Sequence, residues 1–275
     1  MPRRFTHLLA LGVLLVLAAA SLLPLYWMIT GSFKVQTAAM KVPPEWFPAH
    51  PTLHNYRQLF GGSKPVGRWF LNSLIVASSI ALGAVLTSSL AGYAFGKKKF
   101  PGQTLLFWLL LLTMMMPRHI TLIPLFILMR KLDWFDTYQG LIVPFIAYPF
   151  GIFLIKQFMQ SIPNDLLDAA RIDGATEWGL FMRVVVPLSR PALGALAIFA
   201  FVAAWNEYLW QLILVNEETL QTLPVGVSKL VSGLTSYDLG VAMAGATVAF
   251  IPMLIVFLLF QEYFVKGITL GALKG

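Results

Sequence analysis

The chain has 275 residues, of which 58% are hydrophobic and only 12% are charged. This composition excludes a disordered chain, because disordered chains are poor in apolar residues. It also disfavours a water-soluble domain, because in such domains about a quarter of the residues are charged. The net charge of +8 would suggest nucleic acid in a soluble domain, but most basic residues here flank long apolar runs, which indicates lipid headgroups and a membrane protein.

The first apolar run covers residues 8–30 and reaches about 35 Å as a helix, enough to cross a hydrocarbon core of about 30 Å. A cleaved signal peptide is the alternative, because Arg3 and Arg4 form a basic start and residues 18–20 are three alanines. The run continues past these alanines to Trp27, which makes it longer than the apolar part of a signal peptide. The pattern therefore favours an uncleaved anchor.

The next segment, residues 31–69, is too polar to enter lipid and too rich in proline to form one long helix. After it come five further apolar runs, at residues 70–95, 101–129, 139–158, 192–215 and 241–264. The sequence therefore predicts an all-α membrane protein with six transmembrane helices and a long loop between the first two.

Proline and arginine interrupt three of these runs. Pro117 and Arg118 lie within the third run, which is either one kinked span or a span followed by an apolar helix at the outer rim. Pro144, Pro149 and Pro252 predict kinks in the fourth and sixth spans.

The distribution of basic residues predicts the orientation, because cytoplasmic loops carry an excess of lysine and arginine. An even number of spans places both termini on one side. Eleven basic residues fall on that side, including three consecutive lysines at 97–99, against eight on the other side, five of which lie in the loop 31–69. Both termini are therefore predicted to lie in the cytoplasm.

The loop between the fourth and fifth spans, residues 161–190, contains a predicted helix outside the membrane. Asn164 follows a proline and can cap this helix, and Asp165 favours its positive end. Gly174 suits the left-handed position that ends it.

This helix carries Leu166 and Leu167 beside the small Ala169 and Ala170, a combination that suits a groove on a partner protein. The alternative is a helix that rests on lipid, which would need a larger apolar face and more flanking lysine. The residues alone favour docking only slightly.

The same loop resembles a known family motif. The pattern Asp168-Ala169-Ala170-x3-Gly174-x9-Val184-x-Val186-Pro187 is similar to the EAA motif of bacterial ABC importer permeases, with Asp168 in place of the usual Glu and valines in place of Ile and Leu. Further similarity to the maltose-type sugar importers covers nearly the whole chain. It includes Asp173-Gly174-Ala175, Phe181, residues 53–60, Trp205-Asn206-Glu207 and the tail 265–275.

This resemblance implies the type I ABC importer permease fold, a bacterial cytoplasmic membrane, and sugar or oligosaccharide import. It also implies partners: a homologous second permease, two ABC ATPases that hold ATP and Mg²⁺, an extracytoplasmic solute-binding protein and membrane lipids, but no nucleic acid. The residues that it assigns to ATPase coupling are Asp165, Leu166, Asp168, Ala169, Ala170, Asp173 and Gly174. It assigns a tail contact with the ATPases to Lys266, Gly267, Lys274 and Gly275.

Motifs for catalysis or for cofactor binding by this chain are absent from the sequence. It has no G-x-x-x-x-G-K-[ST] loop for a nucleotide and no H-E-x-x-H, its four histidines are scattered, and it has no cysteine. The chain is therefore predicted to be a non-catalytic permease without a metal.

Trp205, Asn206, Glu207 and Tyr208 combine aromatic faces with polar groups, so they form a candidate substrate pathway. Hydrogen bonds that hold helices together are the alternative role for Asn206 and Glu207. Three other functions stay open: an ion-driven secondary transporter with Glu207 as proton carrier, an ABC importer for glycerol phosphate, and a scaffold or sensor without flux.

Overall fold

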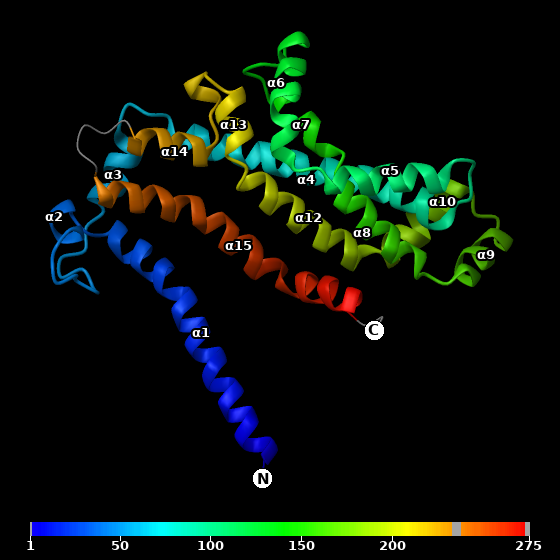
Figure 1. Cartoon of the computed structure of the whole chain (residues 1–275), viewed down its shortest axis with the longest axis horizontal. Helices are drawn as coiled ribbons and strands as arrows, with labels where there is room; N and C mark the ends of the chain where they lie inside the picture. The colour runs from blue at the N-terminus through cyan, green and yellow to red at the C-terminus, as the bar shows by residue number, and fades with distance from the viewer. Residues whose placement is uncertain (1, 233–237, 273–275) are drawn as a thin grey trace. The chain divides into compact units, whose positions relative to one another are not determined.

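A computed structural model describes residues 2–232 and 238–272, and all regular secondary structure in this part of the chain is helical (Figure 1). The all-α prediction is therefore confirmed. The chain divides into two compact units, one made of Met1–Gly67 with Val225–Pro252 and the other of Arg68–Pro224 with Met253–Gly275. Two long helices, α4 (Val66–Lys97) and α15 (Leu239–Ala272), contribute to both units.

The first unit contains the long helix α1 (Pro2–Ser32) and a folded loop at its end, with the short helices α2 (Gln36–Ala39) and α3 (His54–Gly61), and most of α14 (Leu223–Ser232). The buried Asn55 amide of α3 donates to the carbonyls of Ser32 and Lys34 at 2.8 and 2.7 Å. These bonds fix the loop 31–69 to the end of α1. The loop consists of short helices and turns, as expected from its many prolines.

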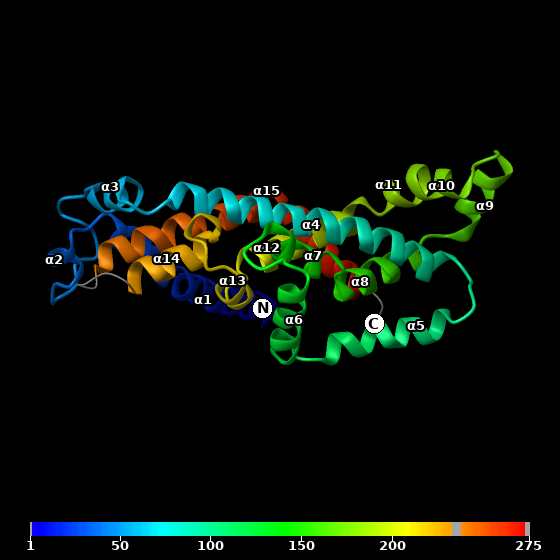
Figure 2. The same ribbon diagram turned by 90° about the horizontal axis from the view of Figure 1, so that it is seen from above.

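The second unit holds the remaining elements in chain order. They are α5 (Gln103–Met115), η1 (Arg118–Thr121), α6 (Leu122–Lys131), α7 (Tyr138–Ile146), α8 (Pro149–Gln160), α9 (Asn164–Ile172), α10 (Glu177–Leu180), η2 (Phe181–Val185), α11 (Val186–Leu188), α12 (Arg190–Trp205), α13 (Leu209–Leu214) and η3 (Glu218–Leu220). Figure 2 shows the chain turning back from α4 into α5, with α9 and α10 beside that same end of α4.

Four stretches of the described chain are long and apolar enough to cross a membrane: Thr6–Ser32, Val66–Lys97, Tyr138–Gln160 and Leu239–Gln261. Two bent helix pairs raise this number to six if each pair is one span. In the third predicted run the axis turns by 91° between Gln103–Met115 and His119–Lys131, so no straight helix forms there. This bend is compatible with both arrangements left open for the third run.

The predicted fifth span at 192–215 is not one helix, which corrects the sequence-based boundary. Helix α12 ends at Trp205 and α13 begins at Leu209. In the fourth span the helix breaks at Ala147 and Tyr148, directly before Pro149, as expected at a residue that precedes proline. Pro144 and Pro252 lie inside α7 and α15.

Candidate functional site

Helix α9 lies on a hydrophobic cluster of its own unit, and this contact decides which of its residues are accessible. Leu167 is only 2% exposed and belongs to a buried cluster with Ile155, Met159, Leu180 and Phe181. Ala170 is half-buried against the same cluster. The prediction that Leu167 belongs to a docking face is therefore wrong, because this side chain fills the core beneath the helix.

The opposite face of α9 is formed by Asp165, Asp168, Ala169 and Ile172, all of which are exposed. We call these four residues the outward face. Ile172 is 87% exposed, whereas Leu166, at the side of the helix, is 47% exposed. The outward face thus presents one large aliphatic and one small apolar side chain between two carboxylates, a surface that can lie in a groove on a partner protein.

The two ends of α9 differ in how well they were predicted. Gly174 has a φ of +81° and Ala175 N donates to the Ala170 carbonyl at 2.9 Å, so the left-handed helix stop is confirmed. Asn164 does not cap the helix: Pro163 occupies the N-cap position, and the Asn164 Oδ1 atom accepts a 2.9 Å hydrogen bond from Lys97 Nζ instead. The Asn164 side-chain oxygen, which the local pattern predicted to cap the helix, thus binds a lysine that is distant in sequence.

Glu177, the first residue of α10, lies at the centre of a charged network. Its carboxylate accepts hydrogen bonds from Lys98 Nζ and, at 3.0 Å, from the Tyr93 hydroxyl, and Arg171 Nη2 lies 3.8 Å away. Arg171 also pairs with Asp168, with 2.6 Å between Nη1 and Oδ1. The Lys98 ammonium and the Tyr93 hydroxyl hold the pKa of the Glu177 carboxyl below its usual value, so it is ionised at neutral pH.

No sequence pattern predicted this network, because the lysines at 97–99 indicated only orientation and neither Tyr93 nor Glu177 belongs to a motif. The pairing joins residues 79 positions apart, so no local pattern indicates it.

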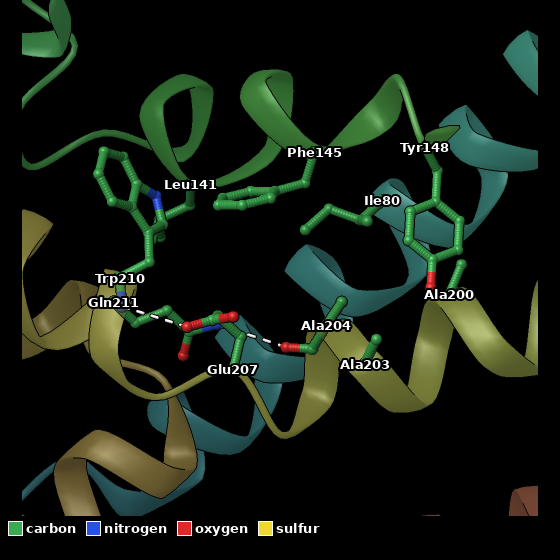
Figure 3. A pocket seen from close by; sticks show the side chains of 10 residues that line it. All are labelled: Ile80, Leu141, Phe145, Tyr148, Ala200, Ala203, Ala204, Glu207, Trp210 and Gln211. Atoms are coloured by element: carbon green, nitrogen blue, oxygen red, sulfur yellow. Dashed lines mark hydrogen bonds between the residues drawn. The ribbon is translucent and has the colours of Figure 1, made fainter. Parts of the chain in front are cut away.

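A second candidate site surrounds Glu207 at the break between α12 and α13 (Figure 3). The Glu207 Oε1 atom accepts from Trp210 N at 3.2 Å and so stabilises the start of α13. Glu207 also lines a cavity of about 20 Å³ with aromatic, aliphatic and amide groups: Ile80, Leu141, Phe145, Tyr148, Ala200, Ala203, Ala204, Trp210 and Gln211. This volume holds one water molecule and is far below the several hundred Å³ of a typical small-molecule site.

The other residues of the predicted substrate pathway do not line this cavity. Trp205 is 2% exposed, with its ring stacked 5.7 Å from that of Phe201. The exposed Asn206 amide donates to the Val202 carbonyl at 3.0 Å, and Tyr208 is 37% exposed. The hydrogen bonds of Asn206 and Glu207 are local, spanning four and three residues along the chain, so the helix-holding role and a substrate pathway through these residues both stay predictions.

A polar cluster holds the segment after α13 on the far end of α4. Asn72 is fully buried, and its Nδ2 atom donates to the carbonyls of Thr219 and Gln221, both at 2.8 Å. The Tyr138 hydroxyl donates to Asn72 Oδ1 at 2.6 Å. One buried amide thus joins α4, the start of α7 and the segment around η3.

The predicted tail contacts lie partly beyond the described residues. The backbone of Lys266 and Gly267 continues α15, which corrects the expectation that the sixth helix ends at residue 264. Lys274 and Gly275 lie outside the described residues.

Comparison with known proteins gives consistent results. Residues 84–270 match the model of a family described as "Binding-protein-dependent transport system inner membrane component". The arabinooligosaccharides transport system permease protein AraQ of Bacillus subtilis (strain 168) is 36% identical over 264 residues, covering 95% of this chain and 93% of AraQ.

Two other relatives transport different solutes according to their names. The sulfoquinovosyl glycerol transport system permease protein SmoH of Agrobacterium fabrum is 36% identical, covering 100% of this chain and 94% of its own. The sn-glycerol-3-phosphate transport system permease protein UgpE of Pectobacterium atrosepticum is 33% identical, with 96% and 95% covered.

Among solved structures, a chain of a bacterial ABC transporter involved in the import of the acidic polysaccharide alginate has a similar fold. It superposes with a TM-score of 0.85 at 23% identity, covering 95% of this chain and 97% of that one.

Proposed function

The chain belongs to the family of binding-protein-dependent transport system inner membrane components, and from this membership we propose that it is the permease through which an ABC importer moves a neutral sugar or oligosaccharide. AraQ and SmoH, whose names refer to sugar-containing solutes, support the sugar. UgpE supports glycerol phosphate as the second candidate. A phosphate would favour a buried Arg or Lys. Among the side chains whose burial the structure describes, the buried cation is Lys34, in the loop after α1, whereas Arg190, which lines a cavity of about 620 Å³, is exposed.

The proposed complex contains a homologous second permease, two ATPase subunits that bind ATP and Mg²⁺, and a solute-binding protein on the outer side, with both termini of this chain in the cytoplasm. A two-state gate needs a bias of about 5.5 kcal/mol to move from 1:99 to 99:1. This sequence has no nucleotide-binding loop, so ATP can supply the bias only through contact with another subunit.

Helix α9 is the proposed contact. The observation that supports it most directly is the exposed Ile172 on the outward face, because the other side of the helix is fixed on the chain's own core through Leu167. A helix held in this way moves with the cluster beneath it and can pass a displacement to the membrane helices.

Affinity purification in mild detergent tests this function. We expect two ATPase chains and a second permease to co-elute, and a sugar screen on the cognate binding protein should identify a ligand that stimulates ATP hydrolysis. Uptake by the chain alone in vesicles, lost in Glu207→Gln, would instead establish the ion-driven transporter. If a complete complex shows no flux, the chain is a scaffold or sensor. If only glycerol phosphate stimulates ATP hydrolysis, the transported solute is glycerol phosphate and not a sugar.

Two neighbouring substitutions test the docking face. Ala169→Asp places a carboxylate on the outward face and should lower substrate-stimulated ATP hydrolysis at least tenfold, an effect of about 1.4 kcal/mol, while the chain stays folded and inserted. Ala170→Asp forces the same carboxylate against the cluster around Leu167, so it should lower the melting temperature as well. Normal coupling in Ala169→Asp, measured by ATPase assay in proteoliposomes, would show that this face does not dock.

A further inference from the structure

Lys97, the last residue of α4, contacts the start of the proposed coupling helix. Its ammonium donates to the Ile162 carbonyl, to Asn164 Oδ1 at 2.9 Å and to the Gln160 carbonyl at 3.5 Å. These three acceptors span the corner at which α8 ends and α9 begins, and they use all three N–H groups of the lysine. The start of α9 is therefore attached to the last turn of α4.

The far end of α9 is attached to the same part of α4 through Glu177. This residue follows the Gly174 stop and accepts hydrogen bonds from Lys98 and Tyr93, both of which lie on α4 or directly after it. Arg171, in the last turn of α9, extends from Asp168 toward the same carboxylate. Both ends of α9 thus connect to residues 93–98, in agreement with its position beside the end of α4 (Figure 2).

The backbone packing beneath these contacts is close. A Cβ atom built on Gly96 would lie 3.1 Å from the Lys156 carbonyl oxygen, and one on Gly92 would lie 3.0 Å from the Lys156 nitrogen. The ring of Tyr93 lies 5.3 Å from that of Phe181, which follows α10. Since α4 and α8 approach so closely at these glycines that an added Cβ atom would crowd both the backbone and the Ile155 side chain of α8, the end of α4, α8, α9 and α10 have little room to move independently.

The Glu177 carboxylate is 60% exposed and its Lys98 partner is 30% exposed. Ion pairs this exposed contribute little to the free energy of unfolding. The effect of the network is therefore to orient α9 relative to α4. Helix α4 has 32 residues and is about 48 Å long, and its other end carries the buried Asn72 that holds the segment around η3. One helix therefore connects the hydrogen bonds at the two ends of α9 with the polar cluster at Asn72.

We propose that Glu177 is a positioning residue that, together with Lys97, fixes α9 to α4, so that displacement of α9 is delivered along α4 to the segment around Asn72. This proposal rests on the proposed import function. It identifies α4 as the element that carries the movement, and it gives the paired Lys98 and Glu177 a role in coupling.

A double-mutant cycle in the reconstituted complex tests the proposal, with Glu177→Gln, Lys98→Met, both together, and Lys99→Met as the matched control on an exposed neighbour. The readout is solute transported per ATP hydrolysed. Each single change should lower this ratio about threefold to tenfold, which lies within the range of about twofold to thirtyfold found for coupling residues. The double variant should be no worse than either single one, and the control should match the wild type.

Melting temperature, subunit co-elution and basal ATP hydrolysis are measured for the same variants and should stay unchanged, because the pair is exposed. Unchanged ratios in both single variants, or losses that multiply in the double variant, would overturn the proposal while leaving the import function intact. A fall in melting temperature that accounts for the lost transport would also overturn it, since the role would then be structural. Failure of the wild-type chain to bind any ATPase would instead refute the import function itself.

Discussion

At the level of single residues, two adjacent leucines of α9 differ in burial, with exposed fractions of 2% for Leu167 and 47% for Leu166. Leu166 and Leu167 are adjacent and identical, and the helical period of α9 does not say which face meets the core. The structure gives Leu167 to the core and leaves Leu166 half-exposed. Gly174 was predictable because a left-handed helix end depends on local backbone conformation. The hydrogen bond between Asn164 and Lys97 was not predictable, because the two residues are distant in sequence.

Alanine substitutions at these two leucines should therefore differ in their effect. Leu167→Ala removes a buried side chain and should lower the free energy of unfolding by about 2–5 kcal/mol. Leu166→Ala, the matched control, should lower it by less than about 1 kcal/mol. Chemical unfolding in detergent, followed by tryptophan fluorescence, measures both values. Equal losses would mean that α9 does not rest on the cluster through Leu167.

At the level of elements, long apolar runs predicted the helices well where nothing polar interrupts them. Residues 70–95 correspond to α4, which extends to Val66–Lys97. Two helices divide the run 192–215, which hydropathy does not reveal because it averages over Asn206 and Glu207, whereas the Glu207 carboxylate accepts from Trp210 N at the start of a separate helix. The candidate coupling loop was found from its motif, but its attachment to α4 depends on tertiary contacts that no local pattern carries.

The buried amide of Asn72 predicts how the segment around η3 is retained. Asn72→Leu keeps the approximate volume but leaves the Thr219 and Gln221 carbonyls without this donor, so the free energy of unfolding should fall by about 2–5 kcal/mol. Hydrogen exchange of residues 216–224 should accelerate more than that of α9. Leu71→Ala, at an exposed neighbouring position, is the control and should change neither quantity appreciably. Unchanged exchange in Asn72→Leu would show that other contacts hold this segment.

At the level of the whole molecule, composition and hydropathy predict a membrane protein and the motif in residues 161–190 indicates a permease, but neither determines its assembly. In the window of α1 that could span a membrane, no residue is buried by the described part of its own unit, so that unit alone does not cover the hydrophobic surface of the helix. The count of spans depends on whether each bent pair crosses once, which hydropathy alone does not decide. Orientation rests on an excess of eleven basic residues over eight, and it can be measured directly.

The absence of native cysteine makes that measurement simple, because a single introduced cysteine is the only thiol in the chain. Met40→Cys lies at an exposed position after α1, and Lys99→Cys lies at an exposed position after α4. If both termini are cytoplasmic, a membrane-impermeant maleimide should label Met40→Cys in spheroplasts and should reach Lys99→Cys only after the membrane is opened. The reverse pattern would invert the topology and place α9 on the outer side, where no ATPase could contact it. Since the coupling role of Ala169, Ile172 and Glu177 requires the cytoplasmic side, this labelling result constrains every proposal made from α9.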